Sequence, residues 1–272
     1  MSVVVIMPAY NAAQTLEITY ASIPMDVVDK VILTDDVSRD ETVEIARKLG
    51  LKTIIHVQNK GYGGNQKTSY LEALKAGAEI VVMLHPDNQY DATRIPALIE
   101  PIKQGQYDMV IGSRLLGRDT LEGGMPLYKF IGNRFLTWLE NRVLGQNLSE
   151  YHSGFRAYSY KFLTTVPFVL NSDDFVFDSE IPAQATAFNF KIGEVAVPTR
   201  YFKEASSINF RRSVVYGLAT VWTMAKFLLY RLGLSKNPQF TKTLSDVISP
   251  YHWSEIERAS ARRDVSEQAR VR

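Results

Sequence analysis

The chain has 272 residues, of which 46% are hydrophobic and 22% charged, and its formal net charge is +2. This size and composition predict a globular, soluble protein with a large core. The small net charge, without a block of lysine and arginine, disfavours a nucleic-acid-binding protein. There is no cysteine, which excludes disulfides, thiolate metal sites and a cysteine nucleophile. With no export signal visible at the N-terminus, we expect a cytoplasmic location.

Short β-branched runs alternate with amphipathic segments in the first half of the chain. Runs bounded by Gly, Pro or Asp predict buried strands at residues 3–7, 30–34, 52–57, 79–84 and 109–112. Apolar residues spaced three and four apart predict helices at residues 13–22, 42–49, 64–76 and 93–104. This order predicts an α/β fold, a doubly wound and mostly parallel twisted sheet with helices on both faces. Ligands bind such sheets beyond the carboxyl ends of the strands.

A polar loop follows each of the five predicted strands: PAYN (8–11), DDVSRD (35–40), NKGYGGN (59–65), HPDNQ (85–89) and GSR (112–114). In the second loop, Asp35 and Asp36 are candidates to accept hydrogen bonds from a nucleotide base or ribose, unless the loop only caps the next helix through Ser38 or Asp40. The glycines of the third loop predict N–H groups that approach an anion closely. The alternative is a flexible turn, since neither a dinucleotide fingerprint nor a Walker sequence is present.

The loop HPDNQ indicates a metal site. In an extended chain alternate side chains project to the same side, so we expect His85, Asp87 and Gln89 to converge on one divalent cation. Oxygen ligands suit hard ions, and the histidine nitrogen favours manganese over magnesium. The alternative is a surface turn with a hydrogen-bonded histidine.

Residues 206–234 predict an amphipathic helix with basic flanks, too interrupted for a confident membrane span. Such a helix suits the interface of an anionic membrane. Packing on the rest of the chain, or on a second copy in a homo-oligomer, remains equally open. Residues 235–272 are polar, and we expect a tail that is a frayed helix or disordered.

Taken in order, these loops and the later SGFR (153–156) resemble the inverting glycosyltransferases of family 2, most closely the dolichyl or polyprenyl phosphate sugar synthases. The resemblance runs from Ser2 to about Arg212. It implies a GT-A catalytic domain over residues 1–205, with a Rossmann-like sheet. It also implies transfer from a UDP- or GDP-linked sugar, with Mn²⁺ or Mg²⁺, to a polyprenyl or dolichyl phosphate at the cytoplasmic face of the membrane. Transfer to a sugar hydroxyl, and a nucleotide-sugar-binding protein without catalysis, remain alternatives.

The resemblance also implies roles for individual residues. The expected nucleotide-binding residues are Pro8, Ala9, Tyr10, Asn11, Asp35, Asp36, Asn59, Lys60, Gly61, Gly64 and Asp87. Asp87 is expected to hold the metal with help from Gln89, while His85 stands where the family usually has an acid. The acceptor phosphate is expected at Arg114, Lys129 and Arg134. A hydroxyl acceptor would need a carboxylate base, for which Glu150, Asp178 and Glu180 are candidates, although the last two are alternatively helix caps.

Overall fold

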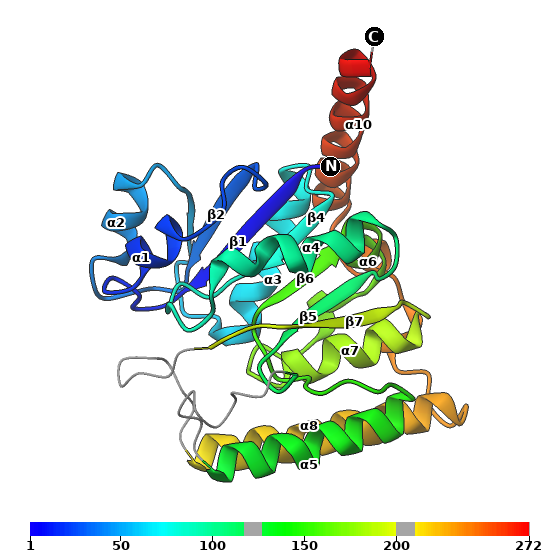
Figure 1. Ribbon diagram of the computed structural model, residues 1–272. Coiled ribbons are helices and arrows are strands. Elements are labelled where there is room, and N and C mark those ends of the chain that lie inside the picture. Colours follow the sequence, from blue (N-terminus) through cyan, green and yellow to red (C-terminus); the bar gives the residue numbers. More distant parts are fainter. Residues whose placement is uncertain (117–126, 200–209, 272) are drawn as a thin grey trace.

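The computed structural model describes residues 1–116, 127–199 and 210–271. Its centre is a seven-stranded sheet with the spatial order β3-β2-β1-β4-β6-β5-β7 (Figure 1). The strands are β1 (Val3–Ala9), β2 (Lys30–Asp35), β3 (Lys52–Ile55), β4 (Ile80–Met83), β5 (Met109–Ser113), β6 (Arg156–Ser159) and β7 (Ile192–Ala196). The helices are α1 (Leu16–Ala21), α2 (Thr42–Lys48), α3 (Gly61–Lys75), α4 (Ile95–Lys103), α5 (Leu127–Leu144), α6 (Tyr160–Thr165), α7 (Phe177–Ala187), α8 (Phe210–Arg231), α9 (Pro238–Thr241) and α10 (Pro250–Val271). Three short turns of 3-10 helix are η1 (Ala92–Arg94), η2 (Phe168–Leu170) and η3 (Leu244–Asp246).

The sheet separates two hydrophobic cores, because successive side chains of a strand point to opposite faces. On β1, Val4 and Ile6 belong to one core, while Val3, Val5 and Met7 belong to the other. The first core is covered by α3, α6, α7 and the C-terminal helices, and the second by α1, α2 and α4 (Figure 1). The α/β class with helices on both faces is therefore confirmed, as are the five predicted strands and four predicted helices.

β6 is a strand that the sequence analysis did not predict. Its four residues start with a buried arginine and include no β-branched side chain, so they show no strand pattern. β6 runs antiparallel between β4 and β5, with Arg156 opposite both Met83 and Ile111. Because its direction is reversed, its first residue lies at the carboxyl ends of the neighbouring strands. The segment SGFR thus joins the edge of the sheet where the other polar loops lie.

The segment 235–272, predicted as a polar tail that is a frayed helix or disordered, is helical and partly packed against the first core. It forms α9, η3 and α10 over its described part, and Phe240, Leu244 and Ile256 are almost fully buried in the first core. These residues are widely spaced among polar ones, so composition indicated a tail. The end of α10 extends away from the body of the molecule (Figure 1). The boundary predicted at residues 205–206 lies outside the described residues.

α5 and α8 lie side by side along one edge of the molecule (Figure 1). One side of α8, with Thr220, Thr223, Met224 and Phe227, is buried against the rest of the chain, including α5 and α7. The opposite side of α8 is exposed. The helix predicted within residues 206–234 is thus present, and it packs along the protein rather than standing apart from it.

The start of α3 lies against the segment that leads into α7. The Gly63 N–H donates to the Asp173 carbonyl oxygen at 2.8 Å. A Cβ atom added to Gly63 would overlap the Ser172 carbonyl oxygen, and one on Gly61 would stand 2.6 Å from the Asp173 carbonyl oxygen. The glycines therefore allow a close approach of two backbones. This contact fixes α3 relative to α7, and both helices contribute side chains to the site.

We predict that Gly63→Ala lowers the free energy of unfolding by about 1–3 kcal/mol, the usual cost of overpacking. The matched control is Gly132→Ala in α5, where an added Cβ meets nothing within 4 Å. That change should stabilise by roughly 0.5–1 kcal/mol, because alanine is the better helix former. Urea denaturation followed by circular dichroism measures both. Equal stability of the two variants would contradict the close contact.

Candidate active site

The loops after β1 and β2 are hydrogen-bonded to each other. The Asn11 N–H donates to Ser38 Oγ at 2.8 Å, and the Arg39 N–H donates to Asn11 Oδ1 at 2.8 Å. Asn11 has a φ of 52°, the left-handed conformation that asparagine tolerates. Pro8 and Ala9 are buried within β1, so Tyr10, which is 54% exposed, is the large side chain that this loop offers to a ligand.

Asp35 and Asp36 differ in how their oxygens are used. Asp36 is buried, and its carboxylate contacts His56 Nδ1 at 2.7 Å and accepts from the N–H groups of Lys60 at 2.8 Å and Gly61 at 3.0 Å. Asp35 Oδ2 accepts from the Ser38 N–H at 3.0 Å, whereas its Oδ1 is buried and meets no donor within the described residues. An unpaired buried oxygen is costly unless a ligand supplies a donor. Asp35 is therefore better placed than Asp36 to accept from a ligand, and the base-reading role expected for Asp36 stays a prediction.

Several N–H groups of the glycine-rich loop are engaged within the protein, and the predicted close approach to an anion stays a prediction. The N–H groups of Lys60 and Gly61 donate to Asp36, and that of Gly63 donates to Asp173. The Asn59 amide donates to the Asp36 carbonyl oxygen at 2.9 Å. These groups bind the loop to β2 and to the α7 side of the molecule. The glycines serve close packing, and the roles expected for Asn59, Lys60, Gly61 and Gly64 in nucleotide binding stay predictions.

The loop HPDNQ turns sharply instead of continuing as an extended chain. Asn88 has a φ of 55°, and Asp87 Oδ1 accepts from the Gln89 N–H at 3.1 Å. The argument from alternating side chains therefore fails, because residues 86–88 form a turn. Within the described residues there is no group of three or more His, Asp and Glu side chains that would hold a metal ion. Asp87 lies partly exposed at the carboxyl end of β4, while Gln89 is buried.

Glu150 and Arg114 form a buried ion pair. The Arg114 backbone N–H and Nε donate to the Glu150 carboxylate at 2.8 Å and 2.9 Å, a guanidinium N–H₂ group adds a third contact, and the Asn133 amide donates at 2.8 Å. Burial favours a raised pKa for Glu150, but the charge and hydrogen bonds of Arg114, with the Asn133 amide, outweigh it and lower the pKa. Glu150 is fully buried. These contacts suit a residue that holds Arg114 in position. The expectation that Glu150 is a proton-accepting base is therefore not supported.

Lys129 lies close to this pair, one helical turn before Asn133 on α5. Burial and the positive charge of Arg114 together lower the pKa of Lys129. No ion pair of Lys129 with a carboxylate is found among the described residues. Two cations that lie close together create a site that an anion would stabilise.

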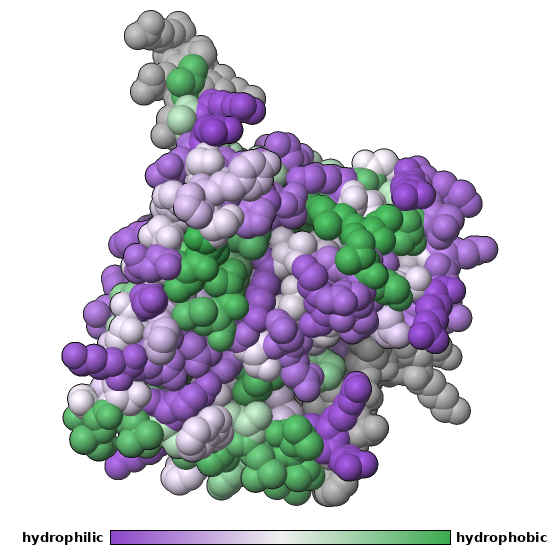
Figure 2. All heavy atoms as spheres, turned by 180° about the vertical axis from the view of Figure 1, so that it is seen from behind, coloured by the Kyte–Doolittle hydropathy of each residue, from purple (hydrophilic) through white to green (hydrophobic). Residues whose placement is uncertain are grey.

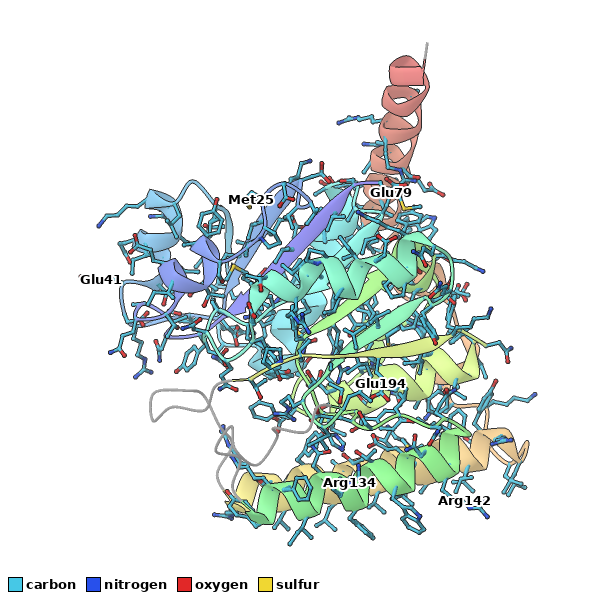
Figure 3. The ribbon with its side chains drawn as sticks, in the orientation of Figure 1. Met25, Glu41, Glu79, Arg134, Arg142 and Glu194 are labelled. Atoms are coloured by element: carbon cyan, nitrogen blue, oxygen red, sulfur yellow. The ribbon has the colours of Figure 1, made fainter. Side chains whose placement is uncertain are left out.

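Arg134 does not join Arg114 and Lys129. It is five residues beyond Lys129, which places it about 140° around the helix. It lines a separate groove with Trp138 and Glu194, between α5 and β7 (Figure 3). The three basic residues predicted for one acceptor phosphate therefore divide between two places.

Asp178 and Glu180 follow each other on α7 but face different surroundings. Glu180 accepts from the Ser172 N–H at 2.6 Å and pairs with Lys226 Nζ at 3.0 Å, which ties α7 to α8. Asp178 Oδ2 accepts from the Tyr62 hydroxyl at 2.7 Å, and its Oδ1 lies 3.6 Å from the Arg156 guanidinium. Neither side chain caps α7. Glu180 joins segments of the protein and is not a candidate base. Asp178 instead contacts Tyr62, which in turn contacts His85 in the loop after β4.

Sequence reasoning did not assign roles to Tyr62 or Asn133. Tyr62 lies inside the glycine-rich loop, whose glycines drew the interpretation toward an anion site. Asn133 is four residues after Lys129, and this spacing could have indicated a shared helix face. Their partners, His85 and Glu150, come from other loops, so only the folded chain reveals these contacts.

Comparisons with known proteins agree with this fold. The profile of the family described as Glycosyl transferase family 2 matches residues 4–166. Over 213 residues the chain is 29% identical to the UDP-N-acetylglucosamine–dolichyl-phosphate N-acetylglucosaminyltransferase of Methanococcus voltae. The aligned region covers 72% of this chain and 84% of that relative. Over 208 residues it is 26% identical to the undecaprenyl-phosphate mannosyltransferase of Micrococcus luteus, covering 72% and 83%.

One solved structure shows the same architecture. It is glucosyl-3-phosphoglycerate synthase from Mycobacterium tuberculosis in complex with Mn²⁺, UDP and glucosyl-3-phosphoglycerate, with a TM-score of 0.63, 22% identity, and coverage of 87% of this chain and 81% of that one. At this identity the likeness establishes the fold, which is GT-A. Since the family profile spans more than half of the chain, the protein belongs to glycosyl transferase family 2 and is a glycosyltransferase.

Proposed function

We propose that this protein transfers a sugar, with inversion at the anomeric carbon, from a UDP- or GDP-linked donor to a polyprenyl or dolichyl phosphate at a membrane surface. The observation that carries the proposal is the neighbouring cations Arg114, which the buried Glu150 holds, and Lys129, which lies at the start of a helix with an exposed apolar side. A lipid phosphate combines the two chemistries that this arrangement suits. The two relatives act on dolichyl phosphate and undecaprenyl phosphate by name, which supports the proposal.

The acceptor chemistry agrees with the state of the carboxylates. A phosphate acceptor is ionised at neutral pH, so its oxygen attacks without a protein base, whereas a sugar hydroxyl needs one. Glu150 is occupied by Arg114 and Asn133, and Glu180 by Lys226 and Ser172. The engagement of both carboxylates favours a phosphate acceptor over a hydroxyl.

A divalent cation fits the donor side. Mg²⁺ and related ions are often held by one or two carboxylates together with substrate phosphates, so a site without three protein ligands is ordinary for them. Asp87, at the turn after β4, would hold the ion, and the solved relative contains Mn²⁺ with UDP. When bound, the ion stabilises the negative charge that develops on the departing diphosphate. The buried, unpaired Oδ1 of Asp35 would accept from the nucleotide.

The membrane side of the proposal rests on α5 and α8. Their exposed apolar residues are Tyr128, Ile131, Phe135 and Trp138 on α5, and Val214, Val215, Leu218, Val221, Trp222, Leu228 and Leu229 on α8. Apolar side chains gather along this lower edge of the molecule (Figure 2). Exposed arginines are Arg134, Arg142, Arg211, Arg212 and Arg231, while the one acid of the two helices, Glu140, is buried. A basic, apolar surface suits anionic lipid.

Two other uses of this surface fit less well. Among the described residues, Arg211–Arg231 is the one stretch long and apolar enough to cross a membrane, with a mean hydropathy of 1.2. Since α8 buries one side against α5 and α7, lying on the bilayer suits it better than spanning. A second copy of the chain would bring an equally basic surface against this one, which like charges oppose. A peripheral location at the cytoplasmic face follows from the proposal.

An assay of sugar transfer to lipid tests the proposed function directly. We expect radiolabelled sugar from UDP- or GDP-sugars to appear in a lipid extract when polyprenyl phosphate and Mn²⁺ are supplied. Lys129→Ala should raise the KM for polyprenyl phosphate about tenfold or more, the loss of one hydrogen bond to a charged group, and leave nucleotide affinity by calorimetry unchanged. Lys161→Ala, on α6, is the control. Labelling of a sugar hydroxyl acceptor without lipid product would overturn the proposal.

Membrane binding is tested on the exposed side of α8. Trp222→Glu should weaken sedimentation with vesicles of phosphatidylglycerol at least tenfold, since burying one large side chain contributes about 1.5–3 kcal/mol and the new charge is repelled. Tyr251→Glu, an equally exposed aromatic on α10, is the control. Sedimentation velocity without lipid tests the alternative that this surface joins two copies of the chain. A dimer that Trp222→Glu dissociates would identify the surface as a subunit interface instead.

A further inference from the structure

Tyr62 connects His85 to a buried carboxylate. Its hydroxyl donates to Asp178 Oδ2 at 2.7 Å, and the same oxygen lies 3.1 Å from His85 Nε2. The two rings are stacked, with centroids 5.3 Å apart and planes inclined by 28°. Residues from α3, the loop after β4 and α7 thus form one chain of hydrogen bonds. Nothing in the proposed acceptor or nucleotide contacts requires it.

This chain determines which nitrogen of His85 carries the proton. The Tyr62 hydroxyl has a single hydrogen to donate. Its one proton is donated to Asp178. The Tyr62 oxygen can then only accept from His85, which requires a hydrogen on Nε2. Nδ1 of the neutral ring is left with a lone pair.

Asp178 is itself held in place. The Arg156 guanidinium, fully buried, donates to the Asp178 carbonyl oxygen at 3.1 Å and lies 3.6 Å from its carboxylate. The Gln66 amide donates to Asp178 Oδ1 at 3.4 Å, which leaves Oδ2 to the Tyr62 hydroxyl. These contacts fix the orientation of the Asp178 carboxylate, which accepts from Tyr62. The tyrosine hydroxyl therefore has a fixed direction in which to donate.

His85 is partly exposed, and the proposed contact of Tyr62 leaves its Nδ1 available to a ligand. No hydrogen bond to Nδ1 is formed within the described residues, and Nδ1 is not among their buried polar atoms that lack a partner. The ring is pressed against Gly154, where a Cβ would stand 2.7 Å from His85 Cδ2. Only a glycine at that position leaves room for this ring. Asp87 lies two residues further along the same turn.

We propose that Tyr62 and Asp178 are positioning residues that hold His85 as the Nε2–H tautomer, so that Nδ1 is a nitrogen ligand of the cation bound at Asp87. Metal-binding histidines generally donate their other N–H in this way, which orients the ring and strengthens the ligand. An imidazole ligand favours Mn²⁺ over Mg²⁺, which prefers oxygen. The proposal rests on the proposed function for the presence of a cation.

Electron spin echo spectroscopy of Mn²⁺ tests the ligand independently of turnover. The full chain is loaded with Mn²⁺ and UDP, or GDP if that binds more tightly. We expect nitrogen hyperfine coupling to the manganese, lost in His85→Asp, which restores an acid while keeping metal binding. Loss of Mn²⁺ binding in Asp87→Ala locates the ion. Manganese that is bound in wild type without nitrogen coupling would overturn the proposal, even if sugar transfer is observed.

Tyr62→Phe tests the positioning role, because it removes the hydroxyl and keeps the ring. We expect Mn²⁺ affinity in the presence of nucleotide to fall about 10–100-fold, the usual effect of losing such a partner, with a smaller change for Mg²⁺. The control is Tyr151→Phe, another buried tyrosine, whose hydroxyl donates to Asn141 Oδ1 at 2.9 Å instead. It should leave the ratio of Mn²⁺ to Mg²⁺ affinity unchanged. An unchanged ratio in Tyr62→Phe, or an equal change in both variants, would overturn the positioning role.

Discussion

The buried ion pair of Glu150 and Arg114 holds together the part of the site that we propose for the acceptor. It joins the end of β5 to the loop before β6, and Asn133 brings α5 into the same contact. Burying a carboxylate is costly, and removing one partner of such a pair usually destabilises a protein by about 3–5 kcal/mol. Here the buried carboxylate holds the positive side chain of Arg114 in one position. Arg114 and Lys129 can then share an anion without moving.

The reversed direction of β6 explains why the ion pair of Glu150 and Arg114 lies beside the loops that we propose for the sugar donor. Because β6 runs antiparallel between β4 and β5, the segment before it returns to the edge where β1, β2 and β4 end. Arg156 at its start contacts Asp178, whose carboxylate holds Tyr62 and, through it, His85. Arg156 also donates to the carbonyl oxygen of Tyr151, the residue after Glu150, so it contacts both the segment of the ion pair and Asp178. α5 leads from this place to the apolar edge of the molecule, so a lipid phosphate and its hydrocarbon tail would meet adjacent surfaces.

The carboxylates show why residue type alone did not assign roles. Glu150, Asp178 and Glu180 were equivalent candidates for a base, yet one positions an arginine, one receives a tyrosine hydroxyl and one pairs with Lys226. Asp35 and Asp36 are neighbours, but only Asp35 keeps a buried oxygen without a partner in the described part of the chain. These differences arise from the partners that other segments supply. No local pattern contains that information.

The sequence by itself determined the α/β class, the five strands of the first half and the edge of the sheet where polar residues gather, because periodicity and turn residues are local properties. The order of its loops also indicated the family. Only the tertiary structure decided the place of β6, the burial of Phe240, Leu244 and Ile256, the turn at Asn88 and the separation of Arg134 from Lys129. Each of these depends on contacts between segments distant along the chain. Such contacts are determined by packing and hydrogen bonding in three dimensions, which spacing along the sequence does not encode.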